Sequence, residues 1–239
     1  MKEIKKLLAL LLALTMVFTF AACGGESASE EPAEEPAQEE PAETAEEPAE
    51  EPSAETETPG KTLVVFFSRV GNSDFSGGVD AVSSASLIDE GGEFVGNAQK
   101  IAEIIAGETG GDLVEVVVKN PYPGDYNETV NQAKEEQNSD ARPELVTVID
   151  NLGEYGTVYL AFPNWWGDLP MALYTFFDEY DFSGKTIKVF ATHEGSGFSG
   201  TIETIKELEP GAEVIEGLSI RGSDVPDSEE DIAEWVQNN

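Results

Sequence analysis

The sequence predicts an α/β fold in which a parallel sheet of five strands is covered by helices on both sides. Two observations support this fold class. Five short apolar runs recur along the chain, and segments with helical spacing of apolar residues lie between or after them. Continuous apolar runs are typical of strands covered on both faces. Strands and helices that alternate in this way form parallel sheets with right-handed crossovers.

The five predicted strands are runs rich in Val, Ile, Leu, Phe and Thr. In chain order they are Thr62–Phe67, Leu113–Val118, Thr157–Phe162, Thr186–Ala191 and Val214–Ile220. Each run is short enough to be a strand of ordinary length. The runs therefore predict a single sheet of five strands.

The predicted helices follow these strands in order. The first has Ile101, Ile104 and Ile105 on one face, the second is the polar segment 126–137, and the third is the apolar segment 171–177. The fourth repeats apolar residues at three-residue spacing over 202–208. The last begins with an acidic turn over 227–230, which suits the positive end of a helix dipole.

Residues 1–23 have the features of a bacterial export signal. Three lysines precede an uncharged run from Leu7 to Ala22 that is short for a membrane span. Phe20-Ala21-Ala22-Cys23-Gly24 resembles the lipobox of bacterial lipoproteins, although Phe20 replaces the usual aliphatic residue. The resemblance implies that Cys23 carries a diacylglyceryl group and becomes the mature N-terminus. An uncleaved anchor helix is the alternative, and both arrangements place the following domain outside the cytoplasm.

Residues 24–60 are predicted to form a disordered tether. The segment contains 14 glutamates and six prolines and has no lysine, arginine or aromatic residue. Such a segment cannot bury enough apolar surface to offset the loss of chain entropy, and its charges repel one another. It is therefore expected to space the domain from its anchor. An acidic ligand for a partner is the alternative interpretation.

Residues 61–239 are predicted to form one acidic domain. They contain 10 basic and 33 acidic residues, which gives a net charge of −23. Nucleic acids are bound largely through lysine and arginine, so this composition argues against a nucleic-acid partner and against binding to an anionic lipid surface. Contact with the membrane is expected through the N-terminal lipid only. The single cysteine argues against a disulfide-based fold, and no metal site is predicted.

The candidate site consists of the loops that follow the first, third and fourth predicted strands. In sheets of this kind, ligands bind beyond the carboxyl ends of the strands, where the strand order reverses. The first loop is Ser68-Arg69-Val70-Gly71-Asn72-Ser73. Its hydroxyls and backbone N–H groups can wrap a phosphate, although it lacks the sequence of a Walker loop. An ordinary strand-to-helix turn is the alternative.

The loop after the third strand reads Pro163-Asn164-Trp165-Trp166-Gly167. Two adjacent tryptophans offer flat faces on which an aromatic ligand can stack. Neighbouring side chains diverge, so one tryptophan is expected to contact the ligand while the other packs or shields. The alternative is that both cover the core.

The loop after the fourth strand reads Thr192-His193-Glu194-Gly195-Ser196. A glycine-containing turn of this kind can bring backbone N–H groups against the edge of a heterocycle. His193 is the only histidine in the chain. Proton transfer, hydrogen bonding to a ligand and a purely structural role all remain open for this side chain. Tyr122 and Tyr126 are further candidates that either reach the site or pack in the core.

Together the three loops resemble those of the bacterial flavodoxin subfamily of the flavodoxin-like family. Members of this subfamily read Tyr/Phe-Phe-Ser-Arg-x-Gly-Asn-Thr, then Pro-Asn-Trp-Trp-Gly, then Thr-His-x-Gly-Ser. The matching residues are 66–73, 163–167 and 192–196, and the resemblance extends over residues 61–239. It implies a three-layer flavodoxin-like sandwich with strand order 2-1-3-4-5 and FMN at the switch point, a rule for which flavodoxin is itself a standard example.

The resemblance also implies which residues bind the cofactor. The ribityl phosphate is expected at Ser68, Arg69, Gly71, Asn72 and Ser73, in a loop that includes Val70. The isoalloxazine ring is expected against Pro163, Asn164, Trp165, Trp166 and Gly167, and its pyrimidine edge against Thr192, His193, Glu194, Gly195 and Ser196.

One segment departs from a short flavodoxin. Residues 74–96 separate the phosphate loop from the first helix. They are predicted to form a hairpin with strands over 81–88 and 93–95 and a glycine turn over 89–92, and to lie as a flap beside the cofactor. The pair Gly96-Asn97 is expected to begin the helix, and Asn97 is expected to share the phosphate.

These inferences predict an FMN-dependent electron-transfer protein that is tethered to the outer face of the membrane. The partner is expected to be a redox protein or a small-molecule acceptor. Two alternatives remain open, namely a two-electron reductase of quinone-like acceptors and a lipoprotein that binds a flavin or another flat solute without redox chemistry.

Overall fold

The computed structural model describes residues 60–79 and 86–239. The predicted export signal, with Cys23, and the predicted tether lie outside these residues, apart from Gly60. No helix in the described part of the chain is long and apolar enough to cross a membrane.

A five-stranded parallel sheet forms the centre of the domain. Its strands are β1 (Lys61–Phe66), β5 (Asp112–Glu115), β7 (Tyr155–Pro163), β8 (Thr186–His193) and β9 (Glu213–Arg221). They lie in the order β5-β1-β7-β8-β9, and every neighbouring pair is parallel. This is the predicted order 2-1-3-4-5, so the flavodoxin-like fold is confirmed.

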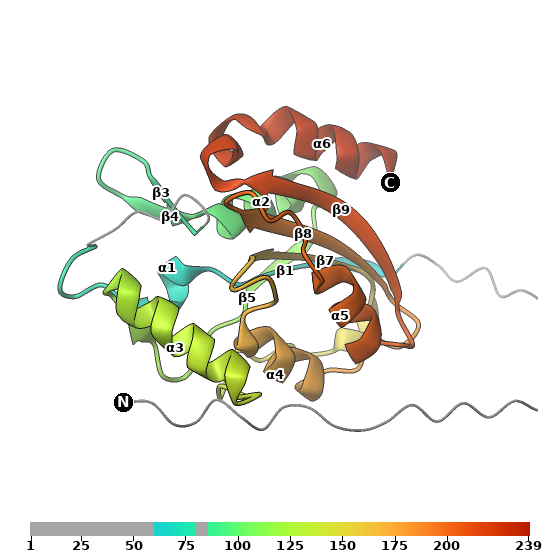
Figure 1. Ribbon diagram of the computed structural model, residues 1–239. Coiled ribbons are helices and arrows are strands. Elements are labelled where there is room, and N and C mark those ends of the chain that lie inside the picture. The colour runs from blue at the N-terminus through green and yellow to red at the C-terminus, as the bar shows by residue number, and fades with distance from the viewer. Residues whose placement is uncertain (1–59, 80–85) are drawn as a thin grey trace, which may run out of the picture. The chain divides into compact units, whose positions relative to one another are not determined.

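Helices cover both faces of the sheet (Figure 1). Helices α2 (Asn97–Thr109) and α6 (Glu229–Asn238) lie on one face, and α3 (Tyr126–Asn138), α4 (Met171–Glu179) and α5 (Thr201–Leu208) lie on the other. Alternate residues of β1 enter different cores, because Val65 packs with residues of α4 and α5 while Val64 packs with residues of α2 and α6. The continuous apolar runs of the sequence therefore reflect burial on two faces.

The second strand of the sheet is shorter than the sequence predicts. The apolar run continues to Val118, but β5 ends at Glu115. Beyond it the backbone turns to other partners, because Val118 N donates to the Asn72 side chain at 2.7 Å and Val117 N donates to Thr147 Oγ1 at 2.7 Å. Residues 116–118 remain apolar because Val116 and Val118 pack in the core.

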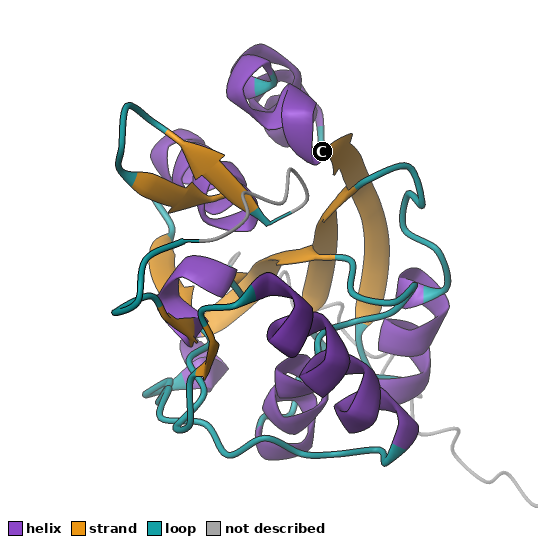
Figure 2. Cartoon of the chain, turned by 60° about the vertical axis from the view of Figure 1, so that its left-hand side comes forward, coloured by secondary structure: helices purple, strands orange, loops and turns teal. Residues whose placement is uncertain are grey.

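The insertion after the first strand contains the predicted hairpin. Strands β3 (Leu87–Asp89) and β4 (Phe94–Gly96) pair in antiparallel register, and Gly91 and Gly92 both have positive φ at the turn. Residues 80–85 of the insertion, which include most of the predicted strand 81–88, lie outside the described residues. Figure 2 shows the hairpin beside helix α2 and separate from the parallel sheet. It lies at the same edge of the domain as the short helix α1 (Arg69–Asn72).

The remaining elements are short. Strand β2 (Ser73–Asp74) follows α1 and pairs in parallel with β6 (Tyr122–Pro123), and 3-10 turns occupy Leu152–Glu154 and Gly222–Asp227. The β2–β6 pair ties the start of the insertion to the segment that precedes α3.

Candidate functional site

A pocket of about 290 Å³ lies at the carboxyl ends of β1 and β7. Residues from all three candidate loops line it, together with residues of α3 and of the insertion. They are Arg69, Ser86, Tyr126, Thr129, Val130, Ala133, Asn164, Trp165, Trp166, Gly167, Glu194 and Ser196. A larger hollow of about 620 Å³ lies between β9 and α6, away from the first and third loops. The smaller pocket is therefore the candidate site, because the strand order reverses between β1 and its neighbours at this position.

Seven of the predicted cofactor-binding residues line this pocket, and ten do not. The ten are Ser68, Val70, Gly71, Asn72, Ser73, Asn97, Pro163, Thr192, His193 and Gly195. Several of them hold the loops in place, as their hydrogen bonds show.

Ser68 and Asn72 shape the first loop from inside the protein. Ser68 caps α1, since its Oγ accepts from Val70 N at 3.1 Å. Asn72 is fully buried and donates to the carbonyls of Ser68 and Val116 at 2.8 and 2.9 Å, while its Oδ1 accepts from Val118 N. These three hydrogen bonds use both donor hydrogens of the amide. The Asn72 side chain thus joins the loop to the end of β5.

Arg69 is buried, although it carries a positive charge. Its Nη2 donates to the carbonyl of Gly124 at 2.9 Å, and its guanidinium lies 5.3 Å and 5.6 Å from the ring centroids of Phe75 and Tyr126. Cation–π contacts of this kind offset part of the cost of burying a guanidinium. Arg69 therefore brings a cation to the pocket and also fixes the segment that leads into α3.

The rest of the first loop and the start of α2 lie close together. Gly96 caps α2, and a Cβ at this position would overlap Ser68 Oγ, so only glycine allows the approach. Asn97 is fully buried, and its backbone N–H donates to Ser86 O at 3.1 Å. The Ser73 Oγ is buried and has no hydrogen-bond partner among the described residues. It is a polar group that a ligand could satisfy.

The carboxyl group of Glu115 lies against the same loop from the end of β5. A Cβ on Gly71 would overlap this carboxyl group. The Glu115 Oε1 is buried without a hydrogen-bond partner among the described residues, and burial raises the pKa of Glu115 to about 7. Desolvation disfavours the charged form of a carboxyl group, which explains the direction of the shift. The first loop therefore has an acidic neighbour that titrates near neutral pH.

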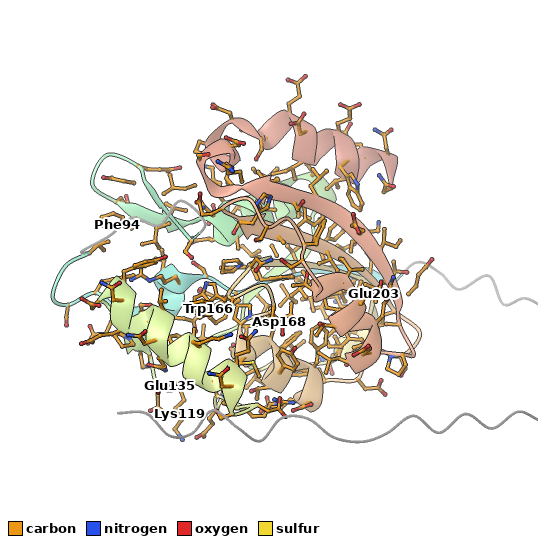
Figure 3. The ribbon with its side chains drawn as sticks, in the orientation of Figure 1. Phe94, Lys119, Glu135, Trp166, Asp168 and Glu203 are labelled. Carbon is orange, nitrogen blue, oxygen red and sulfur yellow. The ribbon has the colours of Figure 1, made fainter. Side chains whose placement is uncertain are left out.

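The two tryptophans point in different directions, as predicted for neighbouring side chains. Trp165 packs edge-on against Phe67 and Tyr122, with ring centroids 5.3 and 5.2 Å away. Trp166 is 51% exposed and lies beside α3 (Figure 3), where its Nε1 donates to Val130 O at 3.0 Å. The Nζ of Lys134 lies 5.0 Å from the centroid of the Trp166 ring. Both rings line the pocket, one from the core side and the other from the solvent side.

A tight turn sets these ring positions. Trp165 and Asp168 exchange two backbone hydrogen bonds, of 3.0 and 3.1 Å, and the two residues between them, Trp166 and Gly167, have positive φ values of 58° and 81°. Both positive angles correspond to a type I′ turn. A tryptophan in this conformation is uncommon and costs conformational energy. Asp168 is anchored in turn, since its Oδ2 accepts from the hydroxyl of Tyr174 at 3.0 Å.

Asn164 links the third loop to the fourth. Its Oδ1 accepts from Gly167 N, and its Nδ2 donates to Gly197 O and to Ser199 Oγ, all at 3.0 Å. Its backbone N–H donates to Thr192 O at 2.8 Å. The two loops therefore form one wall.

In the fourth loop, Glu194 and Ser196 line the pocket, whereas His193 does not. The Nδ1 of His193 accepts from Gly195 N at 2.7 Å, so the neutral ring carries its proton on Nε2. Thr192 is fully buried at the end of β8, beside Pro163 of β7. The fourth loop thus offers the pocket a carboxylate and a hydroxyl.

The sequence did not indicate four of the pocket residues. Thr129, Val130 and Ala133 come from α3, and Ser86 comes from the insertion. The sequence predicts the helix 126–137, but the polar composition of this helix does not show which face meets the pocket. Of the two candidate tyrosines, Tyr126 lines the pocket, and Tyr122 is buried in the core with its hydroxyl 2.9 Å from Glu136 Oε2.

No group of three or more potential metal ligands occurs among the described residues. The pocket combines two indole rings, one buried cation and several hydroxyl groups. This lining suits a flat aromatic ligand that also carries polar groups.

Comparisons with known proteins agree with the fold. The family model Flavodoxin_4, described as "Flavodoxin", matches residues 93–239, so the chain belongs to this flavodoxin family. A Bacteroides uniformis structure described provisionally as a flavoprotein is 26% identical and has a TM-score of 0.57, with 75% of this chain and 99% of that chain covered. No curated protein gives a significant match.

Two further solved structures match most of this chain. A Bacteroides eggerthii protein, also described provisionally as a flavoprotein, is 24% identical with a TM-score of 0.52, with 73% of this chain and 98% of that chain covered. A Lactobacillus acidophilus flavoprotein in complex with FMN is 20% identical with a TM-score of 0.49, with 70% and 97% covered.

Proposed function

We propose that this protein binds FMN in the pocket at the ends of β1 and β7 and transfers electrons. The pocket is the observation that carries the proposal, because it sets Trp165 and Trp166 beside the buried cation Arg69 at the edge where the strand order reverses. Membership of the flavodoxin family supports the same ligand. A flavin is also what the provisional description of the Bacteroides uniformis protein implies.

The residues present fit the three parts of FMN. The buried hydroxyl of Ser73 and the backbone of the Ser68–Ser73 loop would hold the phosphate. The two indole rings would flank the isoalloxazine, and the fourth loop, with Glu194 and Ser196, would face its pyrimidine edge. When bound, FMN would supply the redox chemistry, since residues 61–239 contain no cysteine. The protein's own contribution is to bind, orient and tune the cofactor.

We further propose that the domain acts outside the cytoplasm on a lipid-anchored tether. The Cys23 motif and the acidic segment 24–60 support this arrangement. The electron donor or acceptor is then a redox protein or a small molecule that reaches the exposed Trp166 side of the pocket. The net charge of −23 over residues 61–239 would favour partners with basic surfaces, with association rates that fall as salt rises.

The purified full-length protein tests the cofactor assignment. We expect it to be yellow, with flavin absorbance bands, and to release FMN on denaturation. A colourless protein that does not bind added FMN would contradict the assignment. Reductive titration of the loaded protein then shows whether the flavin accepts electrons singly or in pairs, which separates an electron carrier from a two-electron reductase.

Lipid anchoring needs a separate measurement. We expect metabolic labelling with a radioactive fatty acid to mark the wild-type protein and not the Cys23→Ser variant. Equal labelling of both would show that Cys23 is not the lipidated residue.

A further inference from the structure

Arg221 is the only basic side chain among the described residues that has no hydrogen bond and no ion pair with the rest of the described chain. Five of the ten lysines and arginines in residues 61–239 form ion pairs, and four others donate hydrogen bonds. The first group is Lys61, Lys100, Lys119, Arg142 and Lys206, and the second is Arg69, Lys134, Lys185 and Lys188. In a domain with 33 acidic residues, an unpaired guanidinium is unexpected.

The position of Arg221 is also specific. It is the last residue of β9, and its register partner on β8 is His193. The Nη2 lies 3.2 Å from the point that a Cβ of Gly195 would occupy, so the guanidinium lies against the backbone of the fourth loop. Gly195 has a φ of 122°, a conformation that glycine adopts without strain.

Carboxylates are near enough to share a hollow with Arg221 but do not pair with it. Asp224, Asp227 and Asp231 line the hollow between β9 and α6, to which Arg221 also contributes. The neighbours of Gly195 in the loop, Glu194 and Ser196, line the cofactor pocket. The fourth loop therefore has the proposed cofactor site on one side and, against its backbone, a guanidinium that forms no ion pair.

A cation in this position acts differently on the two redox states of a flavin. FMN that takes up two electrons and one proton gains one negative charge on its ring system. The oxidised ring carries no such charge, so a nearby guanidinium stabilises the reduced form more than the oxidised form. A carboxylate partner would cancel this effect. Among the described residues no carboxylate forms an ion pair with Arg221, so no direct contact neutralises its charge.

We propose that Arg221 tunes the cofactor, acting across the Thr192–Ser196 loop to favour reduced over oxidised FMN. The inference rests on the proposed FMN site. Arg221 is a positioning and tuning residue rather than a catalytic one, because it lies outside the pocket lining. Its effect should be electrostatic and should therefore depend on charge and on ionic strength, whereas a packing role would depend on shape.

The test compares the reduction potential of bound FMN in Arg221→Gln and in the wild type, with dithionite as the reductant and an indicator dye as the reference. We expect the dissociation constant of oxidised FMN, divided by that of reduced FMN, to fall about tenfold in Arg221→Gln. For a two-electron couple this change makes the reduction potential more negative by about 30 mV. Arg221→Lys should retain most of the wild-type ratio. The difference between wild type and Arg221→Gln should shrink in 1 M salt.

Lys206→Gln is the matched control, because it removes the same charge from an exposed site on α5 where the lysine pairs with Glu203. We expect its ratio to stay within about twofold of the wild type. An unchanged ratio in Arg221→Gln would overturn the inference, and so would an equal change in Lys206→Gln. If the wild type bound no FMN, the proposed function itself would fail, which is a separate and recognisable result.

Discussion

The Ser68–Ser73 loop and the Pro163–Gly167 loop lie at the same edge of the sheet but use their side chains in opposite ways. In the first, Ser68, Arg69 and Asn72 are each at most 1% exposed, and their polar groups bond within the protein. In the second, Trp166 keeps half of its side chain exposed, in a conformation that is uncommon for a tryptophan.

The difference indicates how each loop can hold a ligand. Most polar side chains of the first loop form hydrogen bonds within the protein. Binding of an anion there would therefore depend on backbone N–H groups and on the Ser73 hydroxyl. The second loop leaves ring surface open, so its contribution would come from side chains directly. Mutations in the first loop should therefore act on stability, whereas in the second loop mutation of the exposed Trp166 should act on ligand affinity.

Replacing Asn72 by alanine should give the largest effect. The change leaves Val118 N without its acceptor and the carbonyls of Ser68 and Val116 without their donor, at a buried position. Loss of several buried hydrogen bonds should cost about 3 kcal/mol or more in the free energy of unfolding. That corresponds to a fall in Tm of roughly 6–12 °C for a domain of this size. Thermal unfolding by circular dichroism measures it.

Asn131→Ala is the control for this variant, since Asn131 is exposed on α3. Its Tm should change by less than about 2 °C. Equal Tm values for Asn72→Ala and wild type would show that the loop does not depend on the Asn72 side chain, and the proposed contrast between the loops would fail.

The sequence predicted the sheet better than it predicted the site. Runs such as Val64–Phe67 are apolar at every position because two helical layers cover them, and this burial is visible in composition alone. The strand order came from the resemblance of the three loops to flavodoxins and was confirmed. The early end of β5 could not be foreseen, because the Asn72 side chain and the 144–147 segment that take over its backbone partners are distant in sequence.

Within the site, the sequence located the loops but not the direction of their side chains. The pair Trp165-Trp166 does not itself indicate that the first ring packs against Phe67 and Tyr122 while the second contacts α3. The contributions of Val130 and Ala133 depend on how α3 is placed across the pocket, which is a tertiary property. The contact of Glu115 with the first loop could likewise not be predicted, because this residue lies within a run that is typical of an ordinary strand.

The two tryptophans provide the second test, with each serving as the control for the other. Trp166→Ala should lower the affinity for FMN about tenfold and change the Tm by little, because the exposed ring mainly forms the outer wall of the pocket. Trp165→Ala should lower the free energy of unfolding by about 2–3 kcal/mol, since the ring packs against Phe67 and Tyr122. Fluorescence titration with FMN and thermal unfolding measure the two effects. If both variants lost FMN affinity and stability in the same proportion, the two rings would have no distinct roles.

Glu115 gives the smallest effect and the pH dependence. Its pKa is about 7 in the folded protein and 4.5 in an ordinary setting, so between these values the folded state binds more protons than the unfolded state. Stability should therefore fall as pH rises from about 4.5 to about 7. Glu115→Gln should remove this loss. Because the carboxyl group is not fully buried, Glu115→Gln should raise the free energy of unfolding at pH 8 by about 1 kcal/mol, or the Tm by roughly 2–4 °C. At pH 4 the variant and the wild type should be equally stable.

The same residue tests the proposal that the first loop binds the phosphate of FMN. A carboxylate against Gly71 repels an anion in the loop, so the affinity for FMN should fall as pH rises through about 7 in the wild type and less so in Glu115→Gln. Riboflavin lacks the phosphate, and its affinity should not differ between the two proteins in this way. Glu216→Gln, at an exposed position of β9, controls for the loss of one negative charge. Identical pH profiles for FMN in wild type and Glu115→Gln would place the phosphate away from Gly71, and the backbone of the first loop would no longer account for its binding.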